Sequence, residues 1–185
     1  MKCIIFEGAD RLGKDSHIAE LTSGLRNYTI RHWSFPQGQD NDEKTEWQKK
    51  TFLEEFTHYA KSYLELRNHT FFWNRSHIGE FVYGTIYRDS APETWVPDLE
   101  ESFAFDINLD VYLIHLTADP EFLVKQDDGQ SYSNQLEKKR EEIAAFEAAV
   151  NSSKIINKLT IKVNNNDQYN DFQELSQQIR SFVGL

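Results

Sequence analysis

The sequence predicts an α/β fold in which a five-stranded parallel sheet carries helices on both faces. Short apolar runs alternate along the chain with stretches whose apolar residues recur at helical spacing. No internal repeat or low-complexity linker divides the chain. Its 185 residues, of which 39% are hydrophobic, are enough to bury one core. We therefore expect one domain spanning residues 1–185.

The expected strands are short and rich in apolar or β-branched residues. They comprise residues 3–6, 28–33, 70–73, 111–116 and 159–163. The continuous apolar runs among them are typical of strands that are buried on both faces of a parallel sheet.

Between these strands the apolar spacing predicts helices. They comprise residues 14–25, 42–66, 76–87, 136–150 and 171–182. Residues 91–103 show no clear period. Residues 119–135 are polar and rich in turn formers, which predicts a mobile lid at approximately this place.

Composition narrows the classes of function and location. The formal net charge of −10 argues against a broad surface for duplex DNA, which needs a basic face. The single cysteine, Cys3, excludes a disulfide within the chain and favours a reducing cytoplasmic setting. Glu7 and Asp10 interrupt the first apolar run, so it does not resemble a signal peptide, and no stretch is long enough to span a bilayer.

A phosphate-binding loop follows the first predicted strand. Its pattern is G-x-x-x-x-G-K, and a predicted helix follows it, as this motif requires. The backbone N–H groups of such a loop and the helix N-terminus form an anion site, and Lys14 bridges the β- and γ-phosphates. The residues expected to hold a nucleotide are Gly8, Ala9, Leu12, Gly13, Lys14, Asp15 and Ser16.

One position of this loop departs from the usual pattern. A serine or threonine that ligates magnesium normally follows the lysine, but here Asp15 does, with Ser16 next. Either oxygen-bearing side chain suits Mg²⁺. In the alternative, Asp15 merely favours the positive end of the helix dipole.

The stretch from Phe6 to Lys14 resembles the opening of the thymidylate kinases, a family of P-loop nucleotide kinases. The resemblance implies the family's fold, ATP and Mg²⁺ as cofactors, and a homodimer. It also implies that Asp10 contacts the acceptor's sugar hydroxyl and that Arg11 reaches the transferring phosphoryl group. A loop arginine supplies the positive charge on which phosphoryl transfer depends.

A second segment, Asn74-Arg75-Ser76-His77, lies where these kinases carry an Asp-Arg pair. The resemblance implies that Arg75 binds the acceptor phosphate, while Asn74 replaces the family's acid. Residues 76–84 are similar to phage-encoded members, which would act in the host cytoplasm. The acceptor-binding residues that we expect on this segment are Ser76, Glu80 and Tyr83.

Phe35 and Pro36 resemble the family's Arg-Phe-Pro loop, which lines the acceptor pocket. Ser34 stands at the arginine position, so one anchor for an acceptor phosphate is absent. Glu7 matches a glutamate that in nucleoside kinases takes the proton of a 5′-hydroxyl. A structural hydrogen bond is an equally good interpretation of Glu7.

Three hypotheses follow. In the first, the enzyme transfers a phosphoryl group from ATP to a deoxynucleoside monophosphate, with Glu7, Asp10, Arg11 and Lys14 as the catalytic candidates. In the second, the acceptor is a hydroxyl of a nucleoside or of a hydroxymethylated pyrimidine in DNA, which Ser34, Glu7 and Asp10 favour. In the third, Asp15 and Asn74 mark a degenerate nucleotide-binding protein.

Overall fold

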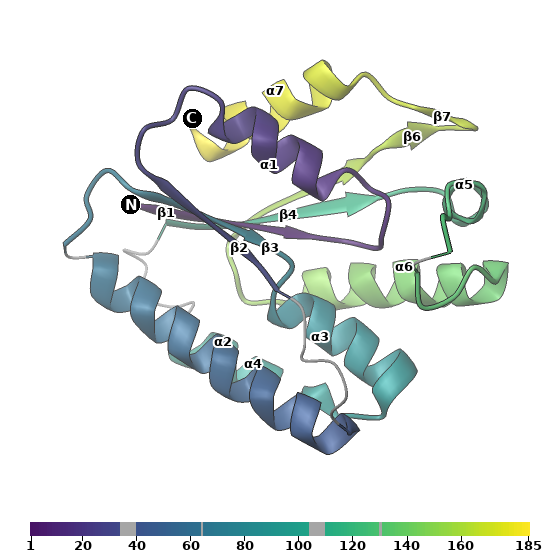
Figure 1. The fold of residues 1–185 in the computed structure, drawn as a ribbon, viewed down its shortest axis with the longest axis horizontal. Coiled ribbons are helices and arrows are strands. Elements are labelled where there is room, and N and C mark those ends of the chain that lie inside the picture. Colours follow the sequence, from purple (N-terminus) through teal and green to yellow (C-terminus); the bar gives the residue numbers. More distant parts are fainter. Residues whose placement is uncertain (34–39, 64, 104–109, 130) are drawn as a thin grey trace.

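The computed structural model describes residues 1–33, 40–63, 65–103, 110–129 and 131–185. Within these residues a parallel five-stranded sheet has the order β2-β3-β1-β4-β5 (Figure 1). The strands are β1 Lys2–Glu7, β2 Tyr28–His32, β3 Thr70–Asn74, β4 Asp110–Thr117 and β5 Asn157–Lys162. The predicted fold class is confirmed.

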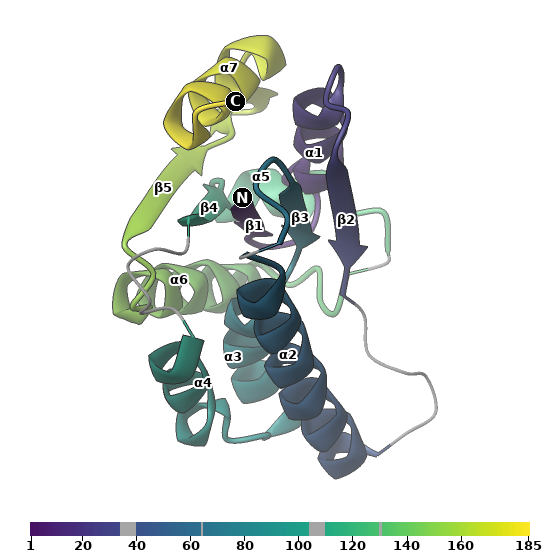
Figure 2. The same ribbon diagram turned by 90° about the vertical axis from the view of Figure 1, so that its left-hand side faces the viewer.

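Helices cover both faces of the sheet (Figures 1 and 2). On one face lie α1 Lys14–Thr22 and α7 Phe172–Val183. On the other lie α2 Asn41–Tyr63, α3 His77–Tyr83, α4 Val96–Phe103 and α6 Leu136–Ser152. The smaller elements are the π-helical turn η1 Gly84–Arg88, the 3₁₀ turn η2 Pro92–Thr94, the short helix α5 Pro120–Lys125, and the hairpin of β6 Asn164–Asn165 and β7 Gln168–Tyr169.

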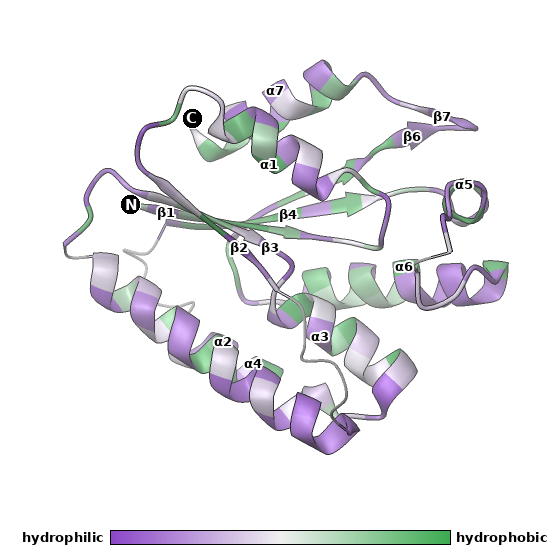
Figure 3. Ribbon diagram, viewed as in Figure 1, coloured by the Kyte–Doolittle hydropathy of each residue, from purple (hydrophilic) through white to green (hydrophobic). Residues whose placement is uncertain are grey.

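The core lies on the central strands, which are the most apolar part of the fold (Figure 3). Residues 3–6 of β1 are at most 1% exposed, as a strand with neighbours on both sides and helices on both faces requires. In the register of β1, Phe6 pairs with Asn74 of β3 and Glu7 with His115 of β4. The carboxyl ends of these strands therefore meet at one edge, where functional loops gather.

Several element ends differ from the prediction. Helix α1 ends at Thr22, three residues before the predicted end, because Gly24 takes a φ of 85° that terminates the helix. Helix α3 ends at Tyr83, and the remainder of the predicted helix forms the π-helical turn. The edge strand β5 begins two residues early, at Asn157, which pairs with Tyr112 of β4.

The segment predicted as a lid begins with α5, and its described remainder, residues 126–129 and 131–135, contains no helix or strand. Elsewhere the two chain ends meet, since Lys2 Nζ donates a hydrogen bond of 2.6 Å to the carbonyl of Gly184. Among the described helices, none combines the length and apolar character needed to cross a membrane.

Candidate functional site

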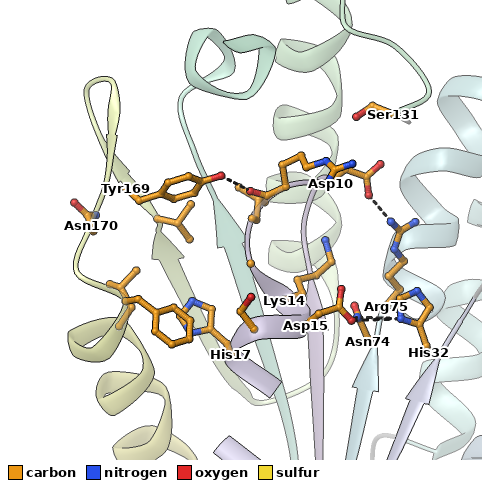
Figure 4. A pocket seen from close by; sticks show the side chains of 17 residues that line it. Asp10, Lys14, Asp15, His17, His32, Asn74, Arg75, Ser131, Tyr169 and Asn170 are labelled. Carbon is orange, nitrogen blue, oxygen red and sulfur yellow. Dashed lines mark hydrogen bonds and ion pairs between the residues drawn. The ribbon is translucent and has the colours of Figure 1, made fainter. Parts of the chain in front are cut away.

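A cavity of about 610 Å³ opens at the carboxyl edge of the sheet (Figure 4). One wall consists of residues 10–17, which form the phosphate loop and the first turn of α1, together with the ends of β2 and β3. The opposite wall comes from residues between Val163 and Leu175, and Ser131 reaches in from the predicted lid. The cavity thus borders the predicted loop from Asp10 onward, whereas Gly8 and Ala9 do not line it.

The loop turns sharply where it leaves β1. Gly8 has a φ of 131°, and a Cβ atom there would lie 2.1 Å from the carbonyl oxygen of Leu116. Only glycine allows this close approach of two backbones. The turn directs the following N–H groups and the start of α1 toward the cavity, which is the geometry of an anion site.

Lys14 is folded back onto this loop. Its Nζ donates hydrogen bonds to the carbonyls of Gly8 at 2.8 Å and Ala9 at 2.7 Å. Burial, with the nearby Arg75 cation, lowers the pKa of Lys14 to about 8. A bound phosphate would offset this desolvation, so the lysine is positioned to exchange carbonyl oxygens for phosphate oxygens.

Two arginines of the cavity wall have strained backbones. Arg11 has a φ of 67° and Arg75 a φ of 71°, values that cost non-glycine residues about 1–3 kcal/mol each. Arg75 is held there by its backbone N–H, which donates to the carbonyl of Phe6 at 2.9 Å. Such strain concentrates at functional sites. Arg11, Lys14 and Arg75 therefore gather three cations in an otherwise acidic chain.

Both arginines have carboxylate partners. The guanidinium of Arg75 pairs with Asp10, and Arg11 pairs with Asp128 of the predicted lid. Burial lowers the pKa of Arg75, but the Asp10 carboxylate and the other acidic side chains around it together raise that pKa above its usual value. Ligand oxygens that enter this site would compete with Asp10 and Asp128 for the two guanidinium groups.

The two positions that depart from the family pattern lie together. The Nδ2 of Asn74 donates to Asp15 Oδ1 and lies 3.1 Å from His32 Nδ1 (Figure 4). The Asp15 side chain is 79% exposed, and Ser16 also lines the cavity. Asn74 Oδ1 is buried without a hydrogen-bond partner. The amide nitrogen thus faces the carboxylate, and a rotation of the amide by 180° would place the oxygen there, where a cation could bind both oxygens.

Glu7 lies behind the cavity wall and is fully buried. Its Oε1 accepts hydrogen bonds from Ser76 Oγ at 2.6 Å and from the N–H of Gly79 at 3.1 Å, while Oε2 has no partner. Burial raises the pKa of Glu7, although these two donors oppose the effect. Ser76 also caps α3. Glu7 and Ser76 therefore tie β1 to α3.

Glu80 and Tyr83 lie on α3 but do not line the cavity. Glu80 is paired with Arg88, and burial raises its pKa against the effect of that cation. Tyr83 stacks on Tyr132 with ring centroids 5.3 Å apart. Of the other residues expected to bind the acceptor, Phe35 and Pro36 lie outside the described residues.

Several cavity residues carry no sequence motif that would have identified them. Tyr169 donates from its hydroxyl to the carbonyl of Arg11 at 2.9 Å. Phe172 stacks on His17 at 4.6 Å, and burial lowers the pKa of His17 to about 4. His32 ends the second strand. The polar turn at residues 164–167 was a weak indication that the chain near Tyr169 approaches the site.

Comparisons with known proteins identify the fold class of this chain. No protein-family model matches the sequence, and no curated protein matches it. Among solved structures, the YorR protein from Bacillus subtilis, in complex with phosphorylated GDP, aligns with a TM-score of 0.62 and 19% identity, covering 100% of this chain and 96% of that one. Thymidylate kinase from Ehrlichia chaffeensis aligns with a TM-score of 0.63 and 15% identity, covering 100% and 98%. The chain has the P-loop nucleotide kinase fold.

Proposed function

We propose that this protein is an ATP-dependent nucleotide kinase that phosphorylates a deoxynucleoside monophosphate. The observation that carries the proposal is the convergence of Arg11, Lys14 and Arg75 on one cavity at a strand–loop–helix anion site. Phosphoryl transfer is catalysed mainly by positioning and by positive charge around the transferred group. The likeness to a thymidylate kinase fold supports the same class of reaction.

The cavity offers a place for each part of ATP. The loop and Lys14 would hold the phosphates. The base would enter the far end, where Val163, Tyr169, Phe172 and Leu175 supply apolar and aromatic surface. Nucleotide sites commonly pair an apolar region for the base with a few polar groups that orient the ligand.

The residues at the start of α1 fit a magnesium ion. Asp15 and Ser16 present a carboxylate and a hydroxyl, which are hard oxygen ligands of the kind that Mg²⁺ prefers. Asn74 would add a third oxygen ligand after a 180° rotation of its amide, because its nitrogen now faces Asp15 and its oxygen has no hydrogen-bond partner. The ion would neutralise charge on the β- and γ-phosphate oxygens.

Both arginine–carboxylate pairs would have to break when the acceptor binds and the phosphoryl group is transferred. An acceptor phosphate would draw Arg75 away from Asp10 and leave the Asp10 carboxylate free to accept a hydrogen bond from a sugar hydroxyl. Arg11 would leave Asp128 to reach the transferred phosphoryl group. Because Asp128 lies within residues 119–135, this exchange would couple phosphate binding to lid position, and a closed lid excludes water.

A hydroxyl acceptor is the second candidate function. The buried Glu7, with its raised pKa and partnerless Oε2, is the observation that favours it, because a hydroxyl needs a base and a phosphate does not. Glu7 does not line the cavity as it stands, so this function requires α3 to move away from the end of β1.

The experiment is a transfer screen with γ-labelled ATP and each of three acceptor sets: the four deoxynucleoside monophosphates, the nucleosides, and DNA with or without hydroxymethylated pyrimidine. Label on a monophosphate supports the first function, and label on a nucleoside or on modified DNA alone supports the second. Lys14→Met serves as the inactive control. Tight ATP binding without transfer to any acceptor would contradict both functions and leave a nucleotide-binding protein.

The homodimer, which the family resemblance implies, and the cytoplasmic location, which the single cysteine and that resemblance favour, are further proposals. Size-exclusion chromatography with light scattering tests the first of them, and a mass of one chain at working concentration would reject it.

A further inference from the structure

Three side chains from three different elements meet beside the phosphate loop (Figure 4). Asp15 comes from the first turn of α1, His32 from the end of β2 and Asn74 from the end of β3. His32 Nδ1 lies 3.5 Å from Asp15 Oδ1 and 3.1 Å from Asn74 Nδ2. All three residues line the cavity.

The hydrogen bonding of Asn74 leaves this cluster incomplete. The amide nitrogen donates to Asp15 and also faces His32 Nδ1, whereas the amide oxygen is buried without a partner. Asn74 is 1% exposed, and a buried acceptor without a donor costs about 1–3 kcal/mol. Rotation of the amide by 180° exchanges its oxygen and nitrogen. The oxygen then faces a carboxylate oxygen and an imidazole nitrogen. In the tautomer in which His32 Nδ1 carries no proton, these three atoms are all acceptors, and a cation among them would remove their mutual repulsion.

Two of the three spacings in the cluster suit an octahedral ion, whereas the contact between Asp15 and Asn74 is shorter and would have to lengthen. Adjacent ligands at about 2.1 Å from such an ion lie about 3 Å from one another. The distances of 3.1 and 3.5 Å from His32 Nδ1 to its two neighbours are close to that value. Across the described ranges no three His, Cys, Asp or Glu side chains gather in a metal-binding group. An ion here would complete its shell with Asn74, water and nucleotide phosphate oxygens.

We propose that His32 ligates the cation of the bound metal–nucleotide complex, together with Asp15 and Asn74, and that the site consequently favours Mn²⁺ over Mg²⁺. The inference deepens the proposed function and rests on it, because the cation accompanies ATP. Imidazole nitrogen binds transition ions well, whereas Mg²⁺ prefers oxygen ligands and gives up its water reluctantly. The side chains of His32 and Asp15 are 54% and 79% exposed, which leaves room for phosphate oxygens.

The direct test is pulsed electron paramagnetic resonance of Mn²⁺ bound with a non-hydrolysable ATP analogue. We expect a ¹⁴N coupling characteristic of a coordinated imidazole, lost in His32→Ala and retained in His58→Ala. His58 is the matched control, because it is an exposed histidine on α2 and does not line the cavity. Bound Mn²⁺ without this coupling in the wild-type protein overturns the inference.

Competition between the two ions supplies the second readout. The Mg²⁺ concentration needed to displace half of the bound Mn²⁺ should fall about tenfold in His32→Ala, which corresponds to the loss of about 1.4 kcal/mol of Mn²⁺ preference. An unchanged midpoint counts against His32 as a ligand. If the analogue itself does not bind, the proposed function fails along with this inference. Analogue binding without nitrogen coupling overturns the inference alone.

Discussion

The buried ion pair between Glu80 and Arg88 decides whether Glu80 is free to recognise an acceptor. The side chains are 2% and 5% exposed, so each charge depends on the other. Removing one partner of a buried pair leaves an uncompensated charge and costs about 3–5 kcal/mol. We predict that Arg88→Met lowers the free energy of unfolding by this amount. For a chain of this size the melting temperature would fall by about 6–20 °C.

The pH dependence has a definite sign. Burial already raises the pKa of Glu80 above its usual 4.5, and loss of Arg88 would raise it further. A carboxyl whose folded pKa is raised contributes stability that is present below the unfolded value and is lost as the pH rises through the folded value. The loss of unfolding free energy caused by Arg88→Met should therefore be larger at pH 8 than at pH 5.

Urea unfolding at both pH values measures the effect. Lys50→Met is the matched control, since Lys50 and Glu54 form an exposed pair at 3.9 Å and their separation should cost less than about 0.5 kcal/mol. Adding Glu80→Gln to Arg88→Met should recover part of the loss, because it removes the stranded charge. The reasoning would be refuted if Arg88→Met lost as little unfolding free energy as the control, or lost the same amount at pH 5 and pH 8. Glu80 would then be available to a ligand.

Three further predictions concern the site. Arg11→Ala should lower the rate of phosphoryl transfer about 10³-fold in single-turnover experiments and change the ATP dissociation constant little, and equal effects on both would mean that Arg11 only assists binding. Gly8→Ala should cost about 3 kcal/mol or more in urea unfolding, because its Cβ would lie 2.1 Å from the Leu116 carbonyl oxygen, and an unchanged midpoint would contradict the geometry. The melting temperature of Glu7→Gln relative to wild type should increase as the pH rises from 4 to 8. The pKa of Glu7 is raised, so the stability that Glu7 contributes to the wild-type protein is lost as the pH rises. A difference in melting temperature that stays constant with pH would count against a titrating Glu7.

Much of the fold was predictable because its determinants are local. The apolar run at residues 3–6 and the helical spacing in the last element each depend on a few neighbouring residues, and both elements form as expected. The end of α1 was predicted three residues too late, because the left-handed conformation of Gly24 outweighs the apolar spacing that continues to Leu25.

The candidate site likewise contains residues that local sequence predicts and residues that only the fold brings together. The phosphate loop is contiguous in sequence, so residues 10–16 could be assigned from the motif, and the structure places all of them on the cavity wall. His32, Tyr169 and Phe172 come from segments far apart in the chain, and no spacing in the sequence joins them to the loop. The burial of Glu80 by Arg88 was likewise not predictable, because the path through the π-helical turn sets it.

The sequence alone determined that this chain builds an α/β sheet with an anion-binding loop after its first strand, because strand, turn and helix are properties of short contiguous segments. Only the tertiary structure decided that Asp15, His32 and Asn74 meet, that Arg75 is held by Asp10, and that Arg11 reaches Asp128 of the predicted lid. The physical reason is the parallel register, which brings the carboxyl ends of β1, β2 and β3 to one edge of the sheet and makes neighbours of residues that are tens of positions apart.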